Sequence, residues 1–341
     1  ASGGSVTIPP QFIGEDSDND GIPDLVELYG LKPNGQPINS NPYSKHSDGD
    51  GLEDNEELHF SRAKMTYELD KSQYDGSVFV WSDPCLEDTD GDGVWDNKDP
   101  IPNIYGISCK LKTSDRNSLF TEIDLQISSD MDLVRTGLQL PYNSVSDCID
   151  IIYDYDNVIT ELSNKYIIPK AAIQAVLLRE LKCFWAQDDF ADSFVLSYYA
   201  YQYQVEYYNN LELWQQMLIQ YPEYPIMSRE DSSTGYGQIF ASTAINANNW
   251  AIEEGIISGD KYDYDDWHQR EEIWNKLRTD NTYNISMIPL VLMHGAYKKG
   301  FDRNYYNYTV EQIKKMLAVY NGDDSYGETV YHSYVIFDKY N

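Results

Sequence analysis

Three short acidic segments near the beginning of the chain carry oxygen ligands at regular positions. They cover residues 16–27, 46–57 and 88–99, and each has aspartate at its third and fifth positions, glycine at the sixth and an acid at the twelfth. Calcium is a hard cation that takes six to eight oxygen ligands, so alternate side chains can surround one ion, while glycine permits the sharp turn. The spacing therefore predicts between two and four structural Ca²⁺ ions.

The expected ligands are the carboxylates at positions 1, 3, 5 and 12 and the backbone carbonyl at position 7. Position 1 of the second segment is His46, a poor calcium ligand, so the other oxygens must supply most of that site. Magnesium fits less well because it retains water and demands octahedral geometry. A solvated acidic loop would explain one such segment, but three with glycine at the same place favour calcium. The predicted ligands are Asp16, Asp18, Asp20, Ile22, Glu27, Asp48, Asp50, Leu52, Glu57, Asp88, Asp90, Asp92, Val94 and Asp99.

A carboxyl group on an apolar helical stripe is the second candidate for chemistry. The pattern after Pro169 is helical, and proline suits the first turn of a helix. At 100° per residue Glu180 lies in line with Ile173 and beside Val176. Burial beside such neighbours raises the pKa of a carboxyl, as a general acid near neutral pH requires. We predict a general acid at Glu180; the plainer alternative is a glutamate at the edge of the stripe, paired with arginine.

Several later segments could form a sugar-binding cleft around this carboxyl. A turn-rich piece contains Gly235-Tyr236-Gly237-Gln238 and leads into a helical pattern near Ser242. Two further segments, at residues 283–285 and 320–322, read Tyr-Asn-Ile and Tyr-Asn-Gly. In this order the segments resemble the goose-type lysozyme and soluble lytic transglycosylase group of the lysozyme-like superfamily, over roughly residues 146–341.

The resemblance implies a role for each matching residue. Glu180 would protonate the glycosidic oxygen, Asp231 would position or activate water, and Tyr320 would orient Glu180. About 50 residues separate the two carboxylates, and the Tyr-rich stretch between them is an insertion relative to the family pattern. Asp231 could instead be a turn or helix cap. The substrate-binding residues that the resemblance implies are Tyr236, Gln238, Asn284 and Tyr320.

The sequence does not decide which residue is the second catalytic carboxylate. Asp188, Asp189 and Asp192 follow Glu180 closely and are rivals to Asp231. A carboxylate that activates water should stand roughly 6.5 to 9.5 Å from the acid and give inversion, whereas a transglycosylase uses groups of the sugar itself. The aromatic residues of the insertion could cover sugar faces, but the helical spacing of Tyr198, Tyr201, Val205 and Tyr208 favours a place in the core or at a helix interface.

The acidic segments resemble thrombospondin type-3 repeats and the calcium module near the front of binary-toxin translocation subunits. The resemblance covers roughly the first 100 residues, and no segment resembling a pore-forming domain follows. It implies a secreted protein in which successive loops share ions. Extracellular calcium reaches the millimolar concentrations that such modules use. Four cysteines allow a disulfide from Cys85 to Cys109 and another from Cys148 to Cys183 in that compartment, with four buried thiols as the alternative.

Composition limits the remaining possibilities. The chain of 341 residues has 56 acidic against 25 basic side chains and a net charge of −31, which excludes a protein that binds nucleic acid through a basic face. No apolar run approaches the roughly 20 residues that span a bilayer. We expect an α+β fold, with a loop-rich calcium-binding repeat module at 1–103, a connecting segment at 104–145, and a mainly helical lysozyme-like catalytic domain with a small β-hairpin at 146–341.

Together these features predict a secreted, calcium-binding peptidoglycan hydrolase, either a muramidase or a lytic transglycosylase. Its partner would be peptidoglycan or a related amino-sugar polymer. The negative charge of the catalytic part is awkward for an anionic wall polymer, because long-range repulsion opposes binding. One alternative is a chitosanase or chitinase of the same superfamily. Another is a calcium-dependent binding or toxin module whose lysozyme-like domain is inactive.

Overall fold

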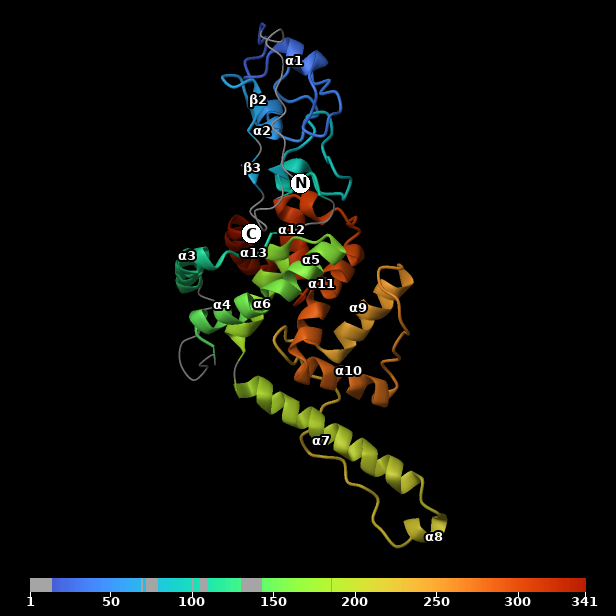
Figure 1. Ribbon diagram of the computed structural model, residues 1–341. Coiled ribbons are helices and arrows are strands. Elements are labelled where there is room, and N and C mark those ends of the chain that lie inside the picture. The colour runs from blue at the N-terminus through green and yellow to red at the C-terminus, as the bar shows by residue number, and fades with distance from the viewer. Residues whose placement is uncertain are drawn as a thin grey trace.

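The computed structural model describes residues 14–68, 70–71, 79–99, 101–104, 109–129, 143–184 and 186–341. Much of the predicted connecting segment therefore lies outside the described residues, as does the beginning of the predicted repeat module. The described chain is mostly helical, with two small two-stranded antiparallel sheets. The prediction of a mainly helical α+β fold is confirmed. Figure 1 shows the acidic loops stacked at one end, a helical body beneath them and a long helical arm beyond it.

The first hundred residues hold only short elements. These are α1 (Asp24–Tyr29), α2 (Asp54–Leu58), β1 (Phe60–Ser61), β2 (Thr66–Tyr67), β3 (Asp70–Lys71), β4 (Phe79–Val80) and the 3-10 helix η2 (Asp96–Lys98). β1 pairs with β2 and β3 pairs with β4, both antiparallel. A small apolar cluster, to which Ile22, Val26, Ile38 and Leu58 belong, lies beneath them. So few apolar residues leave much of the local stability to polar contacts.

The helical body is built around one large apolar core. Its elements are η3 (Thr113–Asp115), α3 (Arg116–Ser129), α4 (Val145–Asp154), α5 (Asp156–Tyr166), α6 (Lys170–Cys183), α9 (Ala241–Glu253), α10 (Trp267–Thr279), α11 (Asn281–Lys298), η4 (Tyr305–Asn307), α12 (Val310–Ala318) and α13 (Asp324–Tyr340). α6 contacts α4, α5, α11 and α13, and every residue from Lys170 to Leu178 is buried. A helix covered on all sides in this way holds its end in a fixed position.

The residues predicted to form a hairpin in the body make only one bridge, between Thr234 and Ile239. The two-stranded sheets instead lie among the acidic loops, where no sequence pattern indicated them. The hairpin prediction therefore holds for the turn but not for a sheet. The turn of residues 235–238 is closed by backbone hydrogen bonds in both directions between Thr234 and Ile239, each 3.2 Å.

The Tyr-rich insertion forms the arm in Figure 1, made of α7 (Ala186–Asn209), α8 (Leu213–Gln216) and a returning segment. Tyr201 packs edge-on against Tyr224 at 5.1 Å and Tyr208 against Tyr221 at 5.0 Å, measured between ring centroids. These tyrosines of α7 thus pack on the returning segment, which is not helical there, while Tyr198 packs against the core and contacts Arg270 of α10. None of the helices in the described part of the chain combines the length and apolar character needed to cross a bilayer.

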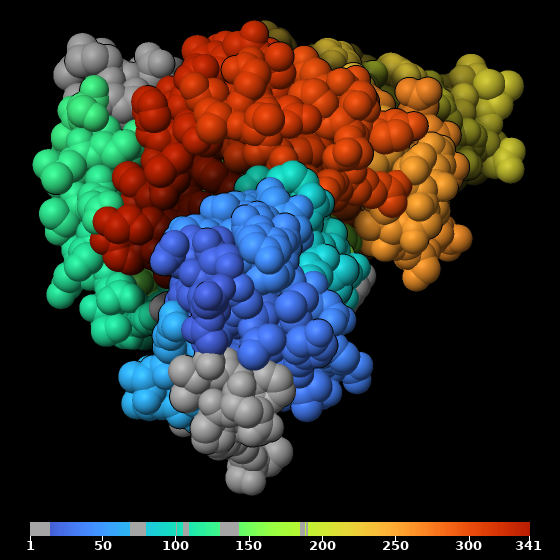
Figure 2. Space-filling view, turned by 90° about the horizontal axis from the view of Figure 1, so that it is seen from above, coloured from blue at the N-terminus to red at the C-terminus, as the bar shows by residue number. Residues whose placement is uncertain are grey.

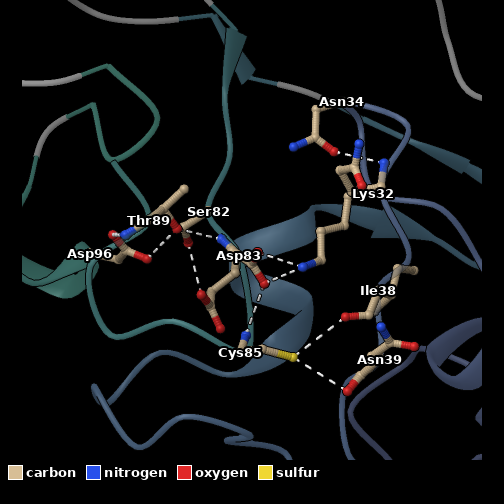
Figure 3. A network of polar contacts seen from close by, with 11 residues as sticks. Lys32, Asn34, Ile38, Asn39, Ser82, Asp83, Cys85, Thr89 and Asp96 are labelled. Atoms are coloured by element: carbon tan, nitrogen blue, oxygen red, sulfur yellow. Dashed lines mark hydrogen bonds and ion pairs between the residues drawn. The ribbon is translucent and has the colours of Figure 1, made fainter. Parts of the chain in front are cut away.

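The four cysteines are free thiols, so neither disulfide that the spacing allowed is present. Cys85 is exposed, and its thiol donates to the carbonyls of Ile38 and Asn39, both at 3.4 Å, as Figure 3 shows. Cys109 and Cys148 are buried. Two cysteines can form a disulfide only where the fold brings them close together in a suitable orientation, and their spacing along the chain does not determine that.

Candidate functional site

Glu180 lies in the last turn of α6, where the buried helix reaches a hollow. Its Oε1 accepts a hydrogen bond of 2.6 Å from the hydroxyl of Tyr326 on α13. The pKa of Glu180 is raised to about 7, chiefly by burial and to a smaller extent by the carboxylate of Asp188, against the lowering effects of Tyr326 and Arg179. A carboxyl with this pKa is protonated in a large fraction of molecules near neutral pH, as general-acid catalysis requires.

The hollow beside this carboxyl, here called the central hollow, has a volume of about 260 Å³. α6, the hairpin turn, α11 and the chain around α13 together form its wall. Polar and apolar groups alternate around it, as in sites that bind polar ligands in a defined orientation. Its lining residues include Arg179, Glu180, Asp188, Ser233, Gln238, Tyr320 and Tyr326.

A second hollow of about 490 Å³, here called the aromatic hollow, lies on the other side of the hairpin turn. Tyr236 lines it and meets the ring of Tyr155 edge-on at 6.0 Å between centroids. Gln238 lines the central hollow instead and donates from Nε2 to the Gly235 carbonyl at 2.8 Å. The turn thus presents these two predicted sugar-contacting side chains to adjacent hollows, and both remain candidates for substrate contact.

Asn284 holds this turn in place from beneath. Its Oδ1 accepts from the Gly237 amide at 2.6 Å, and its Nδ2 donates to the carbonyls of Thr234 and Leu277 at 2.9 and 3.0 Å. A Cβ atom added at Gly235 would lie 2.3 Å from Asn284 Nδ2, and one at Gly237 would lie 2.8 Å from Oδ1. Both glycines are therefore required by this close approach.

Asn284 is fully buried, which corrects its prediction as a substrate-binding residue. All three of its hydrogen bonds go to backbone groups, so its side chain positions the turn. The expectation that Tyr320 orients Glu180 is also corrected. The Tyr320 hydroxyl donates to the Gly237 carbonyl at 2.6 Å, while Tyr326, six residues later in the chain, bonds to the carboxyl. Tyr320 does line the central hollow.

Asp231 caps α9 from outside the helix, which is the alternative that the sequence left open and favours a structural role over the predicted catalytic one. Its two carboxylate oxygens accept from the amides of Ala241 and Ser242, at 3.0 and 2.9 Å, where α9 begins. The first amides of a helix have no partner within it, and a buried carboxylate satisfies them well. Asp231 does not line either hollow described above.

Asp231→Ala is accordingly expected to lower stability without removing catalysis. Loss of a helix cap costs about 0.5–2 kcal/mol. The free energy of unfolding should fall by about this amount, and kcat of the remaining folded protein should stay within a few-fold of the wild-type value. Denaturant unfolding and a rate assay on the same preparation check this. A drop of 100-fold or more in kcat of well-folded protein would restore Asp231 as a catalytic residue.

Two of the rival carboxylates line the hollows described above. Asp188 lines the central hollow together with Glu180. Asp192 lines the aromatic hollow and accepts from the hydroxyls of Ser232 and Thr234, both at 2.8 Å. The side chain of Asp189 lies outside the described residues. Among the rivals whose side chains the structure describes, Asp188 is thus the one that lines the same hollow as Glu180.

The three acidic loops share one internal hydrogen-bonding pattern. The position-3 carboxylate accepts from the position-5 amide, and the position-5 carboxylate accepts from the position-7 amide. The position-2 residue donates its amide and its hydroxyl to the position-9 aspartate. That aspartate, namely Asp24, Asp54 or Asp96, therefore ties the loop together, a role that was not predicted.

Each loop leaves buried carboxylate oxygens without a hydrogen-bond partner. In each case the other oxygen of the same carboxylate is bonded, as in Glu27, whose Oε1 accepts from Ser40 at 3.0 Å. Buried oxygens of this kind are costly unless a cation or a proton occupies the space that they face. The orphaned oxygens are Asp16 Oδ1, Asp18 Oδ2, Asp20 Oδ2, Glu27 Oε2, Asp48 Oδ2, Glu57 Oε2, Asp90 Oδ2 and Asp99 Oδ2.

All of these oxygens belong to residues predicted as calcium ligands, so the donor set fits a hard cation. In the first and third loops the aspartates at positions 1, 3 and 5 lie close enough for one oxygen of each to hold a single ion. In the second loop, His46 Nδ1 contacts the carbonyl of Leu52 at 2.5 Å. Leu52 is at position 7 of its loop. The carbonyl ligands predicted at position 7 of the other two loops belong to Ile22 and Val94.

The raised pKa values of the loop carboxylates also favour a bound cation. Burial, reinforced by neighbouring carboxylates, raises the pKa of Asp20 to about 7, of Glu27 to about 8 and of Glu57 to about 9. In the third loop the same causes raise the pKa of Asp99 to about 8. Without a cation these groups would take up protons near neutral pH to avoid mutual repulsion.

Asparagines join successive loops into a stack. Asn55 of the second loop donates to the Asp20 carbonyl at 3.1 Å, and Asn97 of the third donates to the Asp50 carbonyl. Asn307 of η4 continues the pattern, donating to the Gly93 carbonyl at 3.0 Å and accepting from the Trp95 amide at 3.4 Å. The third loop therefore rests on the helical body, and Figure 2 shows the two in contact.

Side-chain pairs also brace the stack, as Figure 3 shows. Lys32 forms an ion pair of 2.5 Å with Asp83, and both side chains are largely buried. The Asp83 amide donates to the Thr89 hydroxyl at 2.6 Å, and Thr89 bonds in turn to Asp96. Through these contacts the segment after α1 is tied to the third loop.

Sequence reasoning did not select Tyr326, Asn307 or the position-9 aspartates as site residues. For the aspartates the signal was present, because Ser or Thr at position 2 recurs in all three loops. Tyr326 and Asn307 carry no local signal, since their partners are distant in the chain. No family model matches this chain, and no curated protein or solved structure is significantly similar to it.

Proposed function

We propose that this protein is a glycoside hydrolase of the lysozyme-like type, which cleaves the bond between N-acetylmuramic acid and N-acetylglucosamine in peptidoglycan. The observation that carries the proposal is the Glu180 carboxyl, which faces the central hollow with its pKa raised to about 7 by burial. A hydroxyl fixes its orientation at 2.6 Å, and the turn held by Asn284 forms part of the wall. Together these provide a positioned proton beside a space lined with polar groups.

In this mechanism the sugar chain lies across the turn, with the scissile bond in the central hollow. Glu180 donates its proton to the glycosidic oxygen as the carbon–oxygen bond breaks, so the leaving sugar departs as an alcohol. The resulting oxocarbenium-like carbon is attacked by water, which Asp188 can activate, or by a hydroxyl of the same sugar. Tyr326 keeps the carboxyl aimed at the leaving oxygen, and Asn284 fixes the wall that the sugar contacts.

Activity should follow the protonated fraction of Glu180. Because the acid acts only when protonated, kcat/KM is expected to fall as the pH rises through about 7, the pKa of this group. The Tyr326 hydrogen bond stabilises the ionised form, so Tyr326→Phe should move this alkaline limb to higher pH. A pH series of kcat/KM for both proteins measures the shift.

Tyr320→Phe is the matched control for this experiment. It removes a hydroxyl from the same hollow, but one that bonds to the Gly237 carbonyl. The alkaline limb of this variant should stay at the wild-type pH. An unmoved limb in Tyr326→Phe, or an equal movement in both variants, would contradict the assignment of Glu180 as the titrating acid.

The decisive test of the reaction is mass spectrometry of the fragments released from purified peptidoglycan. Reducing ends at muramic acid indicate hydrolysis, and anhydro-sugar ends indicate attack by the sugar's own hydroxyl. Both support the proposed cleavage. Absence of any released fragment, with folded and calcium-loaded protein, would refute it and favour a binding module.

We also propose that the three loops bind calcium and that the protein works outside the cell. The orphaned oxygens support this, because bound Ca²⁺ would supply the positive charge that these buried groups otherwise lack. Millimolar extracellular calcium would load sites of modest affinity. Since the third loop contacts Asn307, loading would also help to hold the stack against the helical body.

A further inference from the structure

A third hollow, of about 380 Å³, adjoins the central hollow. The two share Thr243 and Val291 in their walls. The third hollow lies where the end of α11 meets the chain before α13, and Lys298 and Lys299 stand at it, so it is called here the lysine hollow. The lysine hollow thus adjoins the hollow that Glu180 lines, and the aromatic hollow is lined by the same hairpin segment as that hollow.

The two lysines are neighbours in a chain with 56 acidic and 25 basic side chains. Many cations on the helical body pair with a carboxylate, for example Arg303 with Glu254 and Lys314 with Glu328, both at 2.6 Å. Among the described residues, by contrast, neither Lys298 nor Lys299 has a carboxylate within ion-pair distance. Two adjacent ammonium groups without carboxylate partners in the described part of the chain therefore line one hollow.

The other groups of the lysine hollow leave its charge positive. Asp324, at the beginning of α13, is the acidic residue in its wall, and the two ammonium charges outnumber its single negative charge. His294 also lines the hollow and stacks on Trp250 at 5.2 Å between centroids. Burial and the charge of Lys298 lower the pKa of His294 to about 4, so this ring is neutral at neutral pH. The hollow therefore suits an anion better than a neutral or cationic group.

We propose that the lysine hollow is a subsite for a carboxylate-bearing substituent of the glycan, with Lys298 and Lys299 as its ligands. This inference rests on the proposed cleavage at Glu180. The carboxylate could come from a peptide attached to muramic acid or, where no peptide is attached, from the free lactyl group. Neutral chitin has no group to pair with the lysines, and cationic chitosan would be repelled by them. The subsite also offsets locally the repulsion expected between an acidic protein and an anionic polymer.

The test compares three substrates with the full, calcium-loaded protein: intact peptidoglycan, peptidoglycan whose peptides an amidase has removed, and neutral chito-oligosaccharides. In Lys298→Glu/Lys299→Glu, kcat/KM on intact peptidoglycan should fall roughly tenfold, since exposed ion pairs are individually weak. The value for chito-oligosaccharides should be unchanged. Lys298→Arg/Lys299→Arg should retain most activity. Lys165→Glu/Lys261→Glu, which changes net charge equally at lysines outside the hollows, should behave as wild type.

The substrate arms identify the source of the carboxylate. In intact peptidoglycan the lactyl carboxyl is an amide, so a loss that amidase treatment abolishes assigns the carboxylate to the peptide. A loss that is present after the amidase has freed the lactyl carboxylate assigns it to the lactyl group. An equal loss on neutral oligosaccharides, or no loss on either form of peptidoglycan, would overturn the subsite.

A separate binding measurement keeps the proposal testable if no substrate is cleaved. Calorimetry with a soluble muropeptide in a Glu180→Gln background should give an affinity roughly tenfold weaker when both lysines are reversed. Equal affinities would overturn the subsite by themselves. Wild-type protein that binds the muropeptide through the lysines but cleaves nothing would refute the hydrolase and leave the subsite standing.

Discussion

Glu180→Gln is expected to reduce the release of fragments from peptidoglycan by at least about 100-fold, the lower end of what general-acid catalysis contributes. Glutamine has nearly the same shape and can still accept the Tyr326 hydrogen bond, but it carries no transferable proton. Substrate affinity should therefore change little while kcat falls. Steady-state kinetics with a soluble glycan fragment separates the two parameters.

Stability provides a second readout for this substitution. The wild-type carboxyl has a raised pKa, so at pH 8 its ionised form is held in an unfavourable site, and the neutral amide avoids that cost. Glu180→Gln should then be at least as stable as wild type at pH 8. Glu161→Gln on α5, which removes an exposed carboxylate, is the control and should leave kcat unchanged. A Glu180→Gln protein that is folded and fully active would end the hydrolase proposal.

Removal of calcium is expected to have the largest effect on stability. A site held at a calcium concentration about 100 times its Kd contributes about 2.7 kcal/mol. For a unit of roughly 60–100 residues, 1 kcal/mol shifts Tm by about 4–8 °C. Excess chelator should therefore lower the melting transition of the stacked loops by more than about 10 °C. Calorimetry with and without chelator measures this, and coincident curves would contradict bound calcium.

The dependence on pH should reverse between the two forms. Without calcium, raised pKa values mean that the folded loops bind more protons than the unfolded chain, so stability falls as the pH rises from about 4.5, the ordinary value for glutamate, to about 9, the raised value for Glu57. With calcium, protons compete with the ion for the same oxygens, so stability should fall as the pH decreases. A chelated protein that becomes more stable at alkaline pH would contradict the assigned burial of these carboxylates.

A double substitution distinguishes ion binding from simple damage to the fold. Asp20→Asn/Glu27→Gln removes two charged ligands of the first loop but also removes their repulsion. In calcium it should be less stable than wild type, whereas in chelator at pH 8 it should be equally or more stable. Glu87→Gln, at an exposed acid outside the ligand set, should match wild type in both conditions. A variant that is less stable than wild type in both conditions would indicate that these residues are only structural.

A large part of the candidate chemistry could be predicted from residues that lie close together in the sequence. Within each acidic loop, every ligand lies inside twelve residues, so backbone geometry alone brings the oxygens together. The position of Glu180 on a buried stripe likewise followed from helical periodicity, because α6 is regular and is covered on all sides. Both features depend on residues that are close in sequence, and the structure places the predicted oxygens and the carboxyl accordingly.

Tertiary structure alone decided which groups meet these residues. Tyr326 reaches Glu180 across 146 positions, and Asn307 reaches Gly93 across 214. In the sequence Asp231 precedes a turn. Whether its carboxylate would activate water or accept hydrogen bonds from helix amides depended on where the fold places the beginning of α9. Long-range contacts of this kind depend on how whole helices pack, and packing is set by the combined shape of many side chains. The sequence by itself therefore determined the candidate acid and the candidate ligands, while the fold determined their partners.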